Sequence, residues 1–133
     1  CMNRQTGDNK TVVSLNDAKK NKKGMTMDEV DRILGDNYGS TYSIDYPFDH
    51  TWNLEGGGEL TVIFEAKGCK DRDDFYKKRS ELGFPVQSTD TGGEDYLKVL
   101  KKWQYENTAV TAVYYKSPKE TGLTYLIGSG PEN

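Results

Sequence analysis

His50 is the only histidine of the chain, and it is the side chain best suited to move a proton near neutral pH. Asp49 lies beside it and Cys69 is an available thiol. One hypothesis is therefore a small hydrolase or ligand-binding protein that uses His50 and nearby carboxylates. The histidine lies in a polar connection ahead of a tryptophan-containing strand, where an exposed histidine without a catalytic role is the more common case. We therefore predict no catalytic residue.

The acidic and glycine-rich segments predict neither a metal nor a cofactor. Asp71, Asp73 and Asp74 lack the alternating ligands and the closing glutamate of a calcium loop, and they suit the start of a helix. Residues 56–58, all glycine, lack the Lys-Ser/Thr of a phosphate-binding loop and predict a hairpin turn. Two cysteines and one histidine cannot supply a usual zinc ligand set.

The chain begins with Cys1, as expected of a bacterial lipoprotein whose cysteine carries a diacylglycerol. Residues 1–23 are polar, and six basic against two acidic side chains leave them positively charged. We expect a flexible basic tether, anchored through the lipid on Cys1 to the extracytoplasmic side of the cell membrane. Cys69 is then a buried free thiol, a disulfide partner of Cys1 or a reactive thiol, and the buried thiol is the preferred interpretation. Lipidation of Cys1 would exclude the disulfide.

Length, composition and charge exclude several classes of protein. A chain of 133 residues and 15.0 kDa has room for one domain. Its apolar runs fall well short of the roughly 20 residues that cross a bilayer. The net charge of −3 at pH 7 argues against a nucleic-acid partner. Nine tyrosines, four phenylalanines and two tryptophans argue against disorder.

The clearest local signal is a short amphipathic helix within residues 24–35. Thr26 and Glu29 have the spacing of a capping box, in which each side chain satisfies a free backbone N–H of the first turn. Four apolar residues then lie on one helical face. Gly35 can adopt the left-handed conformation that ends a helix.

Alternation of apolar and polar residues predicts several strands. A second helix is predicted from the aspartates at 71–74 to Leu82, with Gly83 as its end. Pro47 interrupts the first strand and indicates an edge or a bend. The segments predicted as strands are 42–46, 52–54, 60–66, 108–116 and 122–128.

Residues 96–103 fit either a helix or a strand, and an internal repeat decides between them. Leu-Gly occurs at 34–35 and 82–83, and related tryptophan motifs follow at 52–55 and 103–106. The first-half segment is a predicted strand, so we predict a strand at 96–103 as well. The fold class is then α+β, with tandem helix-plus-β-hairpin repeats in one antiparallel sheet and the helices packed on one face. The domains are the tether at 1–23 and a single domain at 24–133, made of repeats 24–68 and 69–133.

Part of the chain, residues 24–66, also resembles a known superfamily. The resemblance rests on Gly-Met-Thr-x-x-Glu-Val-x-x-Ile-Leu-Gly at 24–35, on Trp52 and on the apolar strand that begins at Leu60. This pattern is similar to the fold shared by β-lactamase-inhibitor protein and the small lipoprotein BamE of the SmpA/OmlA family. The chain departs from it at 36–39, where family members often have a proline turn.

The resemblance implies a non-enzymatic protein that binds another protein with one face of its sheet. It carries over the helix and strand positions and no individual partner-binding residue. The Lys-, Asn-, Asp- and Tyr-rich composition is similar to that of low-GC Gram-positive bacteria and their phages, which would exclude a role in outer-membrane assembly.

Aromatic residues in the predicted strands supply the candidate binding face. One face of the sheet must cover the helices, and the other would expose tyrosine and tryptophan, which are favoured at binding hot spots. The alternative is a structural spacer, because tyrosine also simply favours strands. We expect a non-enzymatic lipoprotein that binds an unidentified protein, such as a secreted enzyme, an envelope protein or a phage component. The predicted contact residues are Tyr42, Tyr46, Trp52, Trp103 and Tyr105.

Overall fold

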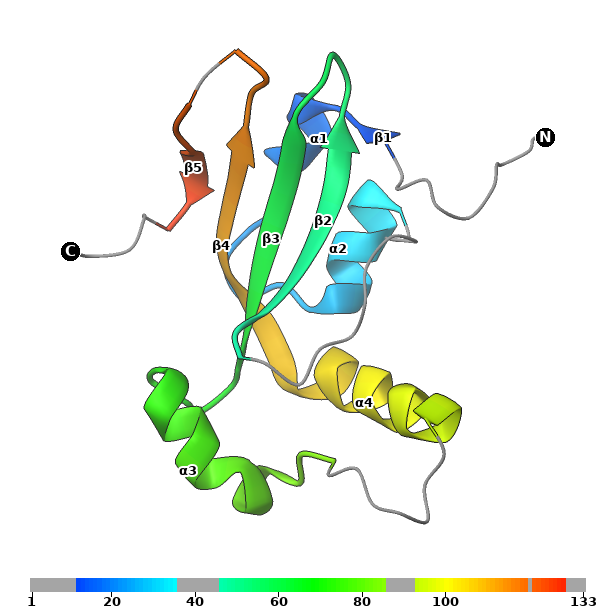
Figure 1. Ribbon diagram of the computed structural model, residues 1–133, viewed down its shortest axis with the longest axis vertical. Coiled ribbons are helices and arrows are strands. Elements are labelled where there is room, and N and C mark those ends of the chain that lie inside the picture. The colour runs from blue at the N-terminus through cyan, green and yellow to red at the C-terminus, as the bar shows by residue number, and fades with distance from the viewer. Residues whose placement is uncertain (1–11, 36–45, 86–92, 120, 129–133) are drawn as a thin grey trace.

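Within the described residues, five strands and four helices form one α+β unit, which confirms the predicted class (Figure 1). The computed structural model describes residues 12–35, 46–85, 93–119 and 121–128. The sheet order is β1-β2-β3-β4-β5; β1 runs parallel to β2 and the other neighbours are antiparallel. The elements are β1 (Val12–Val13), α1 (Leu15–Ala18), α2 (Met27–Leu34), β2 (Phe48–Leu54), β3 (Glu59–Ala66), α3 (Arg72–Leu82), α4 (Gly93–Asn107), β4 (Thr108–Lys116) and β5 (Thr124–Ile127).

Helix α2 forms where the capping box predicts it. The Thr26 hydroxyl accepts the Glu29 backbone N–H at 3.2 Å, and the Glu29 carboxylate accepts the Thr26 backbone N–H at 2.9 Å. Gly35 ends the helix with a positive φ of 86°. The apolar face of α2 is buried against the sheet, so both the helix and its orientation follow from this short stretch of sequence.

One face of the sheet carries the core. Side chains alternate across a strand, and on β2 and β3 every second residue is buried. These side chains pack with buried residues from all four helices in a single cluster. Its strand members are Val13, Phe48, Trp52, Leu54, Leu60, Val62, Phe64, Ala66, Val110 and Val113.

The predicted strand at 96–103 is wrong, because these residues lie in α4. Tyr96, Leu100 and Trp103 are buried and follow the spacing of one helical face, whereas Lys98 and Lys102 are exposed. The helical periodicity was present in the sequence, and the comparison with the first half favoured the wrong alternative. Two helices, not one, therefore precede the second hairpin.

The predicted flexible tether at 1–23 is also wrong for its second half. Val13 is buried and belongs to β1, which pairs with β2, and Ala18 of α1 is fully buried in the core. Burial of this apolar surface offsets the entropy cost of ordering a polar segment. Residues 1–11 lie outside the described residues, so the domain begins by Val12.

The link between α1 and α2 is bonded to the far end of the chain. The Gly24 backbone N–H donates to the Val110 carbonyl at 2.9 Å, and the Val110 N–H donates to the Met25 carbonyl at 2.8 Å. One edge of β4 pairs with β5 near Tyr114. At Val110, residues 24–25 occupy the same edge in place of β5. This pairing places α2 beside the sheet.

Three glycines make the predicted hairpin turn between β2 and β3, and Gly58 is the most constrained of them. Its φ is +90°, and a Cβ added there would lie 2.2 Å from the Lys116 carbonyl oxygen. By contrast, Gly56 has a positive φ but open space, and Gly122 has neither restriction.

We expect Gly58→Ala to lower the free energy of unfolding by about 3 kcal/mol or more, because backbone strain and a backbone clash combine. Gly56→Ala should cost about 1 kcal/mol, and Gly122→Ala less than about 0.5 kcal/mol. Urea unfolding of the three variants checks this order. Equal costs for Gly58→Ala and Gly56→Ala would contradict the close approach of the turn to β4.

Candidate functional site: the open face of the sheet

The second face of the sheet is left uncovered by the described helices. In Figure 1 the strands lie in front of α1, so this face is turned toward the viewer. We call it the open face. Its apolar side chains do not belong to the core cluster or to the residues packed against it. By strand alternation and register the open face consists of Asp49, Thr51, Asn53, Glu59, Thr61, Ile63, Glu65, Ala109, Ala112, Tyr114, Lys116 and Tyr125.

A cross-strand row of hydroxyl-bearing side chains lies at the centre of the open face. Thr61 is the register partner of Tyr114, and Tyr114 is the partner of Tyr125. The two tyrosine rings have centroids 5.0 Å apart and are tilted by 44°. Both tyrosines are half-buried, so each presents part of a large, rigid ring.

Tyr114 stays a neutral hydrogen-bonding group at physiological pH. Partial burial raises the pKa of its phenol, the hydrogen bond with Thr61 lowers it in part, and the negative charge of Asp49 raises it again. A phenol of this kind can donate one hydrogen bond and accept another. The centre of the open face is therefore amphipathic and uncharged.

Apolar and acidic side chains flank this row on one side. Asp49, Ile63 and Ala112 are register partners across β2, β3 and β4, and Glu65 pairs with Ala109 in the adjacent row. On the other side, Glu59 is the register partner of Lys116. The open face thus carries three carboxylates and one ammonium group around half-buried apolar and aromatic side chains.

The chemistry available on the open face is that of binding. Phenols, carboxylates and half-buried apolar groups provide hydrogen bonds, charge and contact area, which are the components of protein interfaces. Among the described residues, no group of three or more His, Cys, Asp and Glu side chains could hold a metal ion. None of the described helices is long and apolar enough to span a membrane.

His50 lies on the other side of the sheet from the open face, contrary to the expected exposed position. Only 2% of its surface is accessible, and its ring lies 5.2 Å from that of Phe64 and 6.1 Å from that of Trp52, measured between centroids. Asp49, its neighbour in β2, is exposed on the opposite face because adjacent strand residues alternate. The two side chains therefore cannot act together on one bound molecule.

The electrostatics of His50 also differ from those of a general base. Burial, together with the positive charge of Lys101, lowers the pKa of His50 to about 4. An efficient general base has a pKa near the working pH. The imidazole is thus a neutral part of the core at physiological pH.

Three of the predicted contact residues are buried, so the prediction that they form an exposed binding face is wrong. Tyr46, Trp52 and Trp103 are less than 9% exposed. Tyr46 stacks on Phe75 of α3 with a centroid distance of 4.2 Å, and α3 and α4 lie at the end of the sheet where β2 begins (Figure 1). Their large rings fill the core instead of presenting a surface to a partner.

The indole N–H of each tryptophan also donates a hydrogen bond to a carbonyl at the end of a helix. The Trp52 indole N–H donates to the Gly35 carbonyl at 3.1 Å, just beyond α2, and the Trp103 indole N–H donates to the Leu82 carbonyl at 3.0 Å in the last turn of α3. Carbonyls at the end of a helix lack partners within the helix. The two indoles therefore link α2 to the sheet and α3 to α4.

The other two predicted contact residues are Tyr105, on α4, and Tyr42. Tyr105 is half-buried, and its hydroxyl donates to the Asp31 carboxylate at 2.5 Å, which joins α4 to α2. Lys101 Nζ lies 5.6 Å from the centre of the Tyr105 ring. Tyr42 lies outside the described residues, as does Cys1, the predicted lipidation site.

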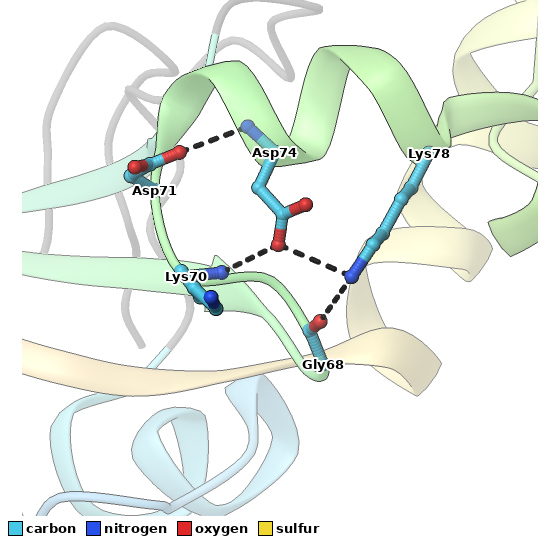
Figure 2. Close-up of polar contacts among 5 residues, drawn as sticks. All are labelled: Gly68, Lys70, Asp71, Asp74 and Lys78. Atoms are coloured by element: carbon cyan, nitrogen blue, oxygen red, sulfur yellow. Dashed lines mark hydrogen bonds and ion pairs between the residues drawn. The ribbon is translucent and has the colours of Figure 1, made fainter.

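The aspartates at 71–74 begin α3, as predicted. Figure 2 shows the Asp71 carboxylate accepting the Asp74 backbone N–H, at 2.9 Å. The Asp74 carboxylate accepts the Lys70 backbone N–H at 2.9 Å and pairs with Lys78 Nζ at 3.2 Å. These contacts lower the pKa of Asp74, the Lys70 bond most strongly. The start of α3 therefore accounts for the positions of Asp71 and Asp74.

Cys69 is a free, half-buried thiol beside this helix start. Burial raises the pKa of the Cys69 thiol, and the charge of Asp74 raises it further. Reactive cysteines have a lowered pKa, because the thiolate is the nucleophile. The structure thus favours the unreactive interpretation of Cys69 over the reactive one.

Sequence reasoning counted Tyr114 and Tyr125 among the strand aromatics but did not select them. The available signal was the strand at 108–116, in which Tyr114 alternates with the buried Val113. The incorrect strand at 96–103 placed Trp103 and Tyr105 on the sheet instead. The open face could be identified only after residues 96–103 were known to be helical.

The burial of His50 predicts a pH dependence of stability. Folded His50 titrates at about 4 and unfolded histidine near 6.5, so between these values the unfolded chain binds more protons. Stability should therefore fall as the pH drops from about 6.5 to about 4, by up to about 3 kcal/mol. Urea unfolding of the wild type and His50→Phe across this range isolates the contribution. Parallel curves for the two proteins would contradict a neutral, buried His50.

The burial of both tryptophans predicts weak fluorescence quenching. Trp52 and Trp103 are 0% and 7% exposed, so iodide should quench neither in the folded protein. Trp52→Phe and Trp103→Phe isolate each signal, and quenching should rise on unfolding in urea. Strong quenching of folded Trp103→Phe, in which Trp52 is the remaining indole, would contradict the core packing of β2.

Comparisons with known proteins add no assignment to this geometry. The resemblance of residues 24–66 to the BamE and β-lactamase-inhibitor superfamily stays a prediction, as do the partner and the location that it implies. No protein-family model matches the chain, and no curated protein or solved structure is significantly similar to it.

Proposed function

We propose that the protein is a non-enzymatic binding module that contacts a protein partner through the open face of its sheet. The observation that carries this proposal is the row formed by Thr61, Tyr114 and Tyr125 with the neighbouring Ile63. These rings and apolar groups lie outside the core cluster, so they contribute little to the core of the isolated domain. Contiguous aromatic and apolar surface of this kind is typical of binding sites.

The enzyme alternative has little support from the same geometry. It requires His50 to meet a substrate beside a carboxylate, whereas His50 is buried among aromatic rings and Asp49 points to the other face. A group with a pKa of about 4 in an apolar environment is a poor proton acceptor at neutral pH. The proposal therefore assigns His50 to stability and the open face to function.

We also propose that the two halves of the chain are a degenerate tandem repeat. The order of elements supports it, because a pair of helices precedes an antiparallel pair of strands twice: α1, α2, β2 and β3, then α3, α4, β4 and β5. Trp52 and Trp103 lie on different kinds of element, yet each donates its indole N–H to a carbonyl at the end of a helix. This common role gives a physical reason for the similar tryptophan motifs.

We also propose a membrane tether, which is shorter than predicted because it ends before β1. If Cys1 carries a lipid, residues 1–11 separate the anchor from a domain that begins at β1. Intact mass of the protein from its native host, with fractionation beside Cys1→Ser, tests the anchor independently of the open face. An unmodified Cys1 in the native protein would remove the tether and leave the binding proposal intact.

Site-directed photo-crosslinking tests the binding proposal. Benzoylphenylalanine in place of Ile63 or Tyr125 should give a discrete crosslinked protein in intact cells, because both positions lie on the open face. The matched control is benzoylphenylalanine in place of Val99, which is 51% exposed on α4. Thermal unfolding of each variant shows whether it folds.

The position dependence of the crosslink decides the outcome. The proposal predicts the product at Ile63 and Tyr125 and not at Val99. Equal products at all three positions would indicate non-specific collisions. A product at Val99 alone would assign binding to the helical side and overturn the proposal.

A further inference from the structure

A basic turn on the helical side of the sheet forms a second contact surface. Residues 19–23 join α1 to α2, and we call them the lysine turn after their four exposed lysines, Lys19, Lys20, Lys22 and Lys23. We infer that the lysine turn binds the anionic headgroups of a lipid membrane and leaves the open face directed away from that membrane. This inference rests on the proposed membrane tether and specifies which side of the domain meets the lipid.

The lysine turn is held in place by its buried centre. Asn21 is only 3% exposed, and its side-chain Nδ2 donates to the Ala18 carbonyl at 2.9 Å. The Asn21 backbone N–H donates to the same carbonyl at 3.2 Å. Directly after the turn, the Gly24 N–H is bonded to Val110 of β4. The lysines therefore lie at a defined place on the folded domain and not in a flexible tail.

Most of the positive charge of the turn is not offset by an ion pair. Lys20 Nζ pairs with Asp17 at 2.9 Å, and no described residue forms an ion pair with the other three lysines. The next acidic residues along the chain, Asp28 and Glu29, lie in the first turn of α2, at the positive end of the helix dipole. The whole chain has a net charge of −3, so the turn is a local basic surface on an acidic protein.

This distribution of charge favours a lipid surface over a nucleic acid. Lysines close to an anionic bilayer strengthen binding, and electrostatic interactions decay within a Debye length. A bilayer can thus contact the turn while acidic parts of the protein stay farther away. Nucleic acids are bound by basic domains of high pI, whereas this chain has a pI near 5.2.

The position of the turn determines the orientation of the domain. The helices that it joins, α1 and α2, contribute Ala18 and Met27 to the core on one face of the sheet, and the open face is the other one. Figure 1 shows α1 behind the strands, on the side away from the open face. A membrane at the turn therefore leaves the open face accessible to a protein partner.

The chain before β1 is long enough for one bilayer to hold the anchor and to contact the turn. Residues 1–11 lead from the proposed anchor at Cys1 to β1, and α1 is the only element between β1 and the turn. A coil of eleven residues spans roughly 17–20 Å on average. The lipid on Cys1 and the lysines would then act together, as two signals for one membrane.

The test uses the Cys1→Ser chain, which cannot carry the lipid, so that the turn is judged apart from the anchor. The probes in co-sedimentation are vesicles of phosphatidylcholine alone and vesicles of equal parts phosphatidylcholine and phosphatidylglycerol. At low salt we expect binding to the second kind only, and weaker binding at physiological salt. A DNA duplex is the third probe and should bind more weakly than the anionic vesicles.

Matched double variants separate the turn from overall charge. Lys22→Gln combined with Lys23→Gln should weaken binding to the anionic vesicles about tenfold to thirtyfold. Lys77→Gln combined with Lys98→Gln removes the same charge from exposed positions of α3 and α4. This control should leave binding within about twofold of the parent chain. Thermal unfolding shows whether each variant folds.

A second measurement gives the orientation and needs no variant of the turn. Nanodiscs of the same anionic composition, with a lipid that carries a gadolinium chelate, are added to the 15N-labelled Cys1→Ser chain. The amide signals of residues 19–23 should broaden, and those of Tyr114 and Tyr125 should keep their intensity. Broadening at the two tyrosines instead would mean that the open face meets the lipid and would overturn the inference.

The other outcomes are also decisive. Equal weakening by both double variants, equal binding to both kinds of vesicle, tighter binding of the DNA duplex, or no binding to anionic vesicles at low salt would each overturn the inference. None of these results decides the proposed function, because the mass of native Cys1 tests the anchor and the crosslinks at Ile63 and Tyr125 test the open face. An unmodified Cys1 together with vesicle binding through the turn would remove the anchor and leave the turn as the membrane contact.

Discussion

The indole hydrogen bonds of the two tryptophans fix the ends of two helices, α2 against the sheet and α3 against α4. Trp52 joins the strand β2 to the end of α2, and Trp103 joins α4 to the end of α3. Each ring also fills the core beside aromatic neighbours, so one side chain provides both packing and the missing partner of a carbonyl. The helices that the structure describes leave the opposite face of the sheet uncovered.

Local signals predicted the elements that depend on a few neighbouring residues. The capping box of Thr26 and Glu29 defined α2, Asp71 and Gly83 bounded α3, and alternation identified β3 and β4. The hydrogen bonds that stabilise these features join residues within one or two turns of the chain. For that reason they could be recognised without knowledge of the tertiary structure.

The remaining features depend on distant contacts, and sequence reasoning assigned them wrongly. Residues 96–103 have the pattern of a helix and of a strand, and packing against the core decides for α4. Strand β1 consists of two valines and exists through its pairing with β2, and two residues are too short to show the alternation of a strand. The error at 96–103 also moved the candidate site, because it placed Trp103 on the sheet.

The backbone pairing of Gly24 and Met25 with Val110 also affects how the protein can be made. A ribosome delivers the chain from its amino end, so α2 is complete long before its neighbour on β4 exists. A nascent chain that stops before Val110 lacks the residue that makes both backbone bonds to residues 24–25. It also lacks strands β4 and β5, of which β4 contacts α2. Folding of the first half is therefore coupled to synthesis of the second, even if the two halves arose from one duplicated unit.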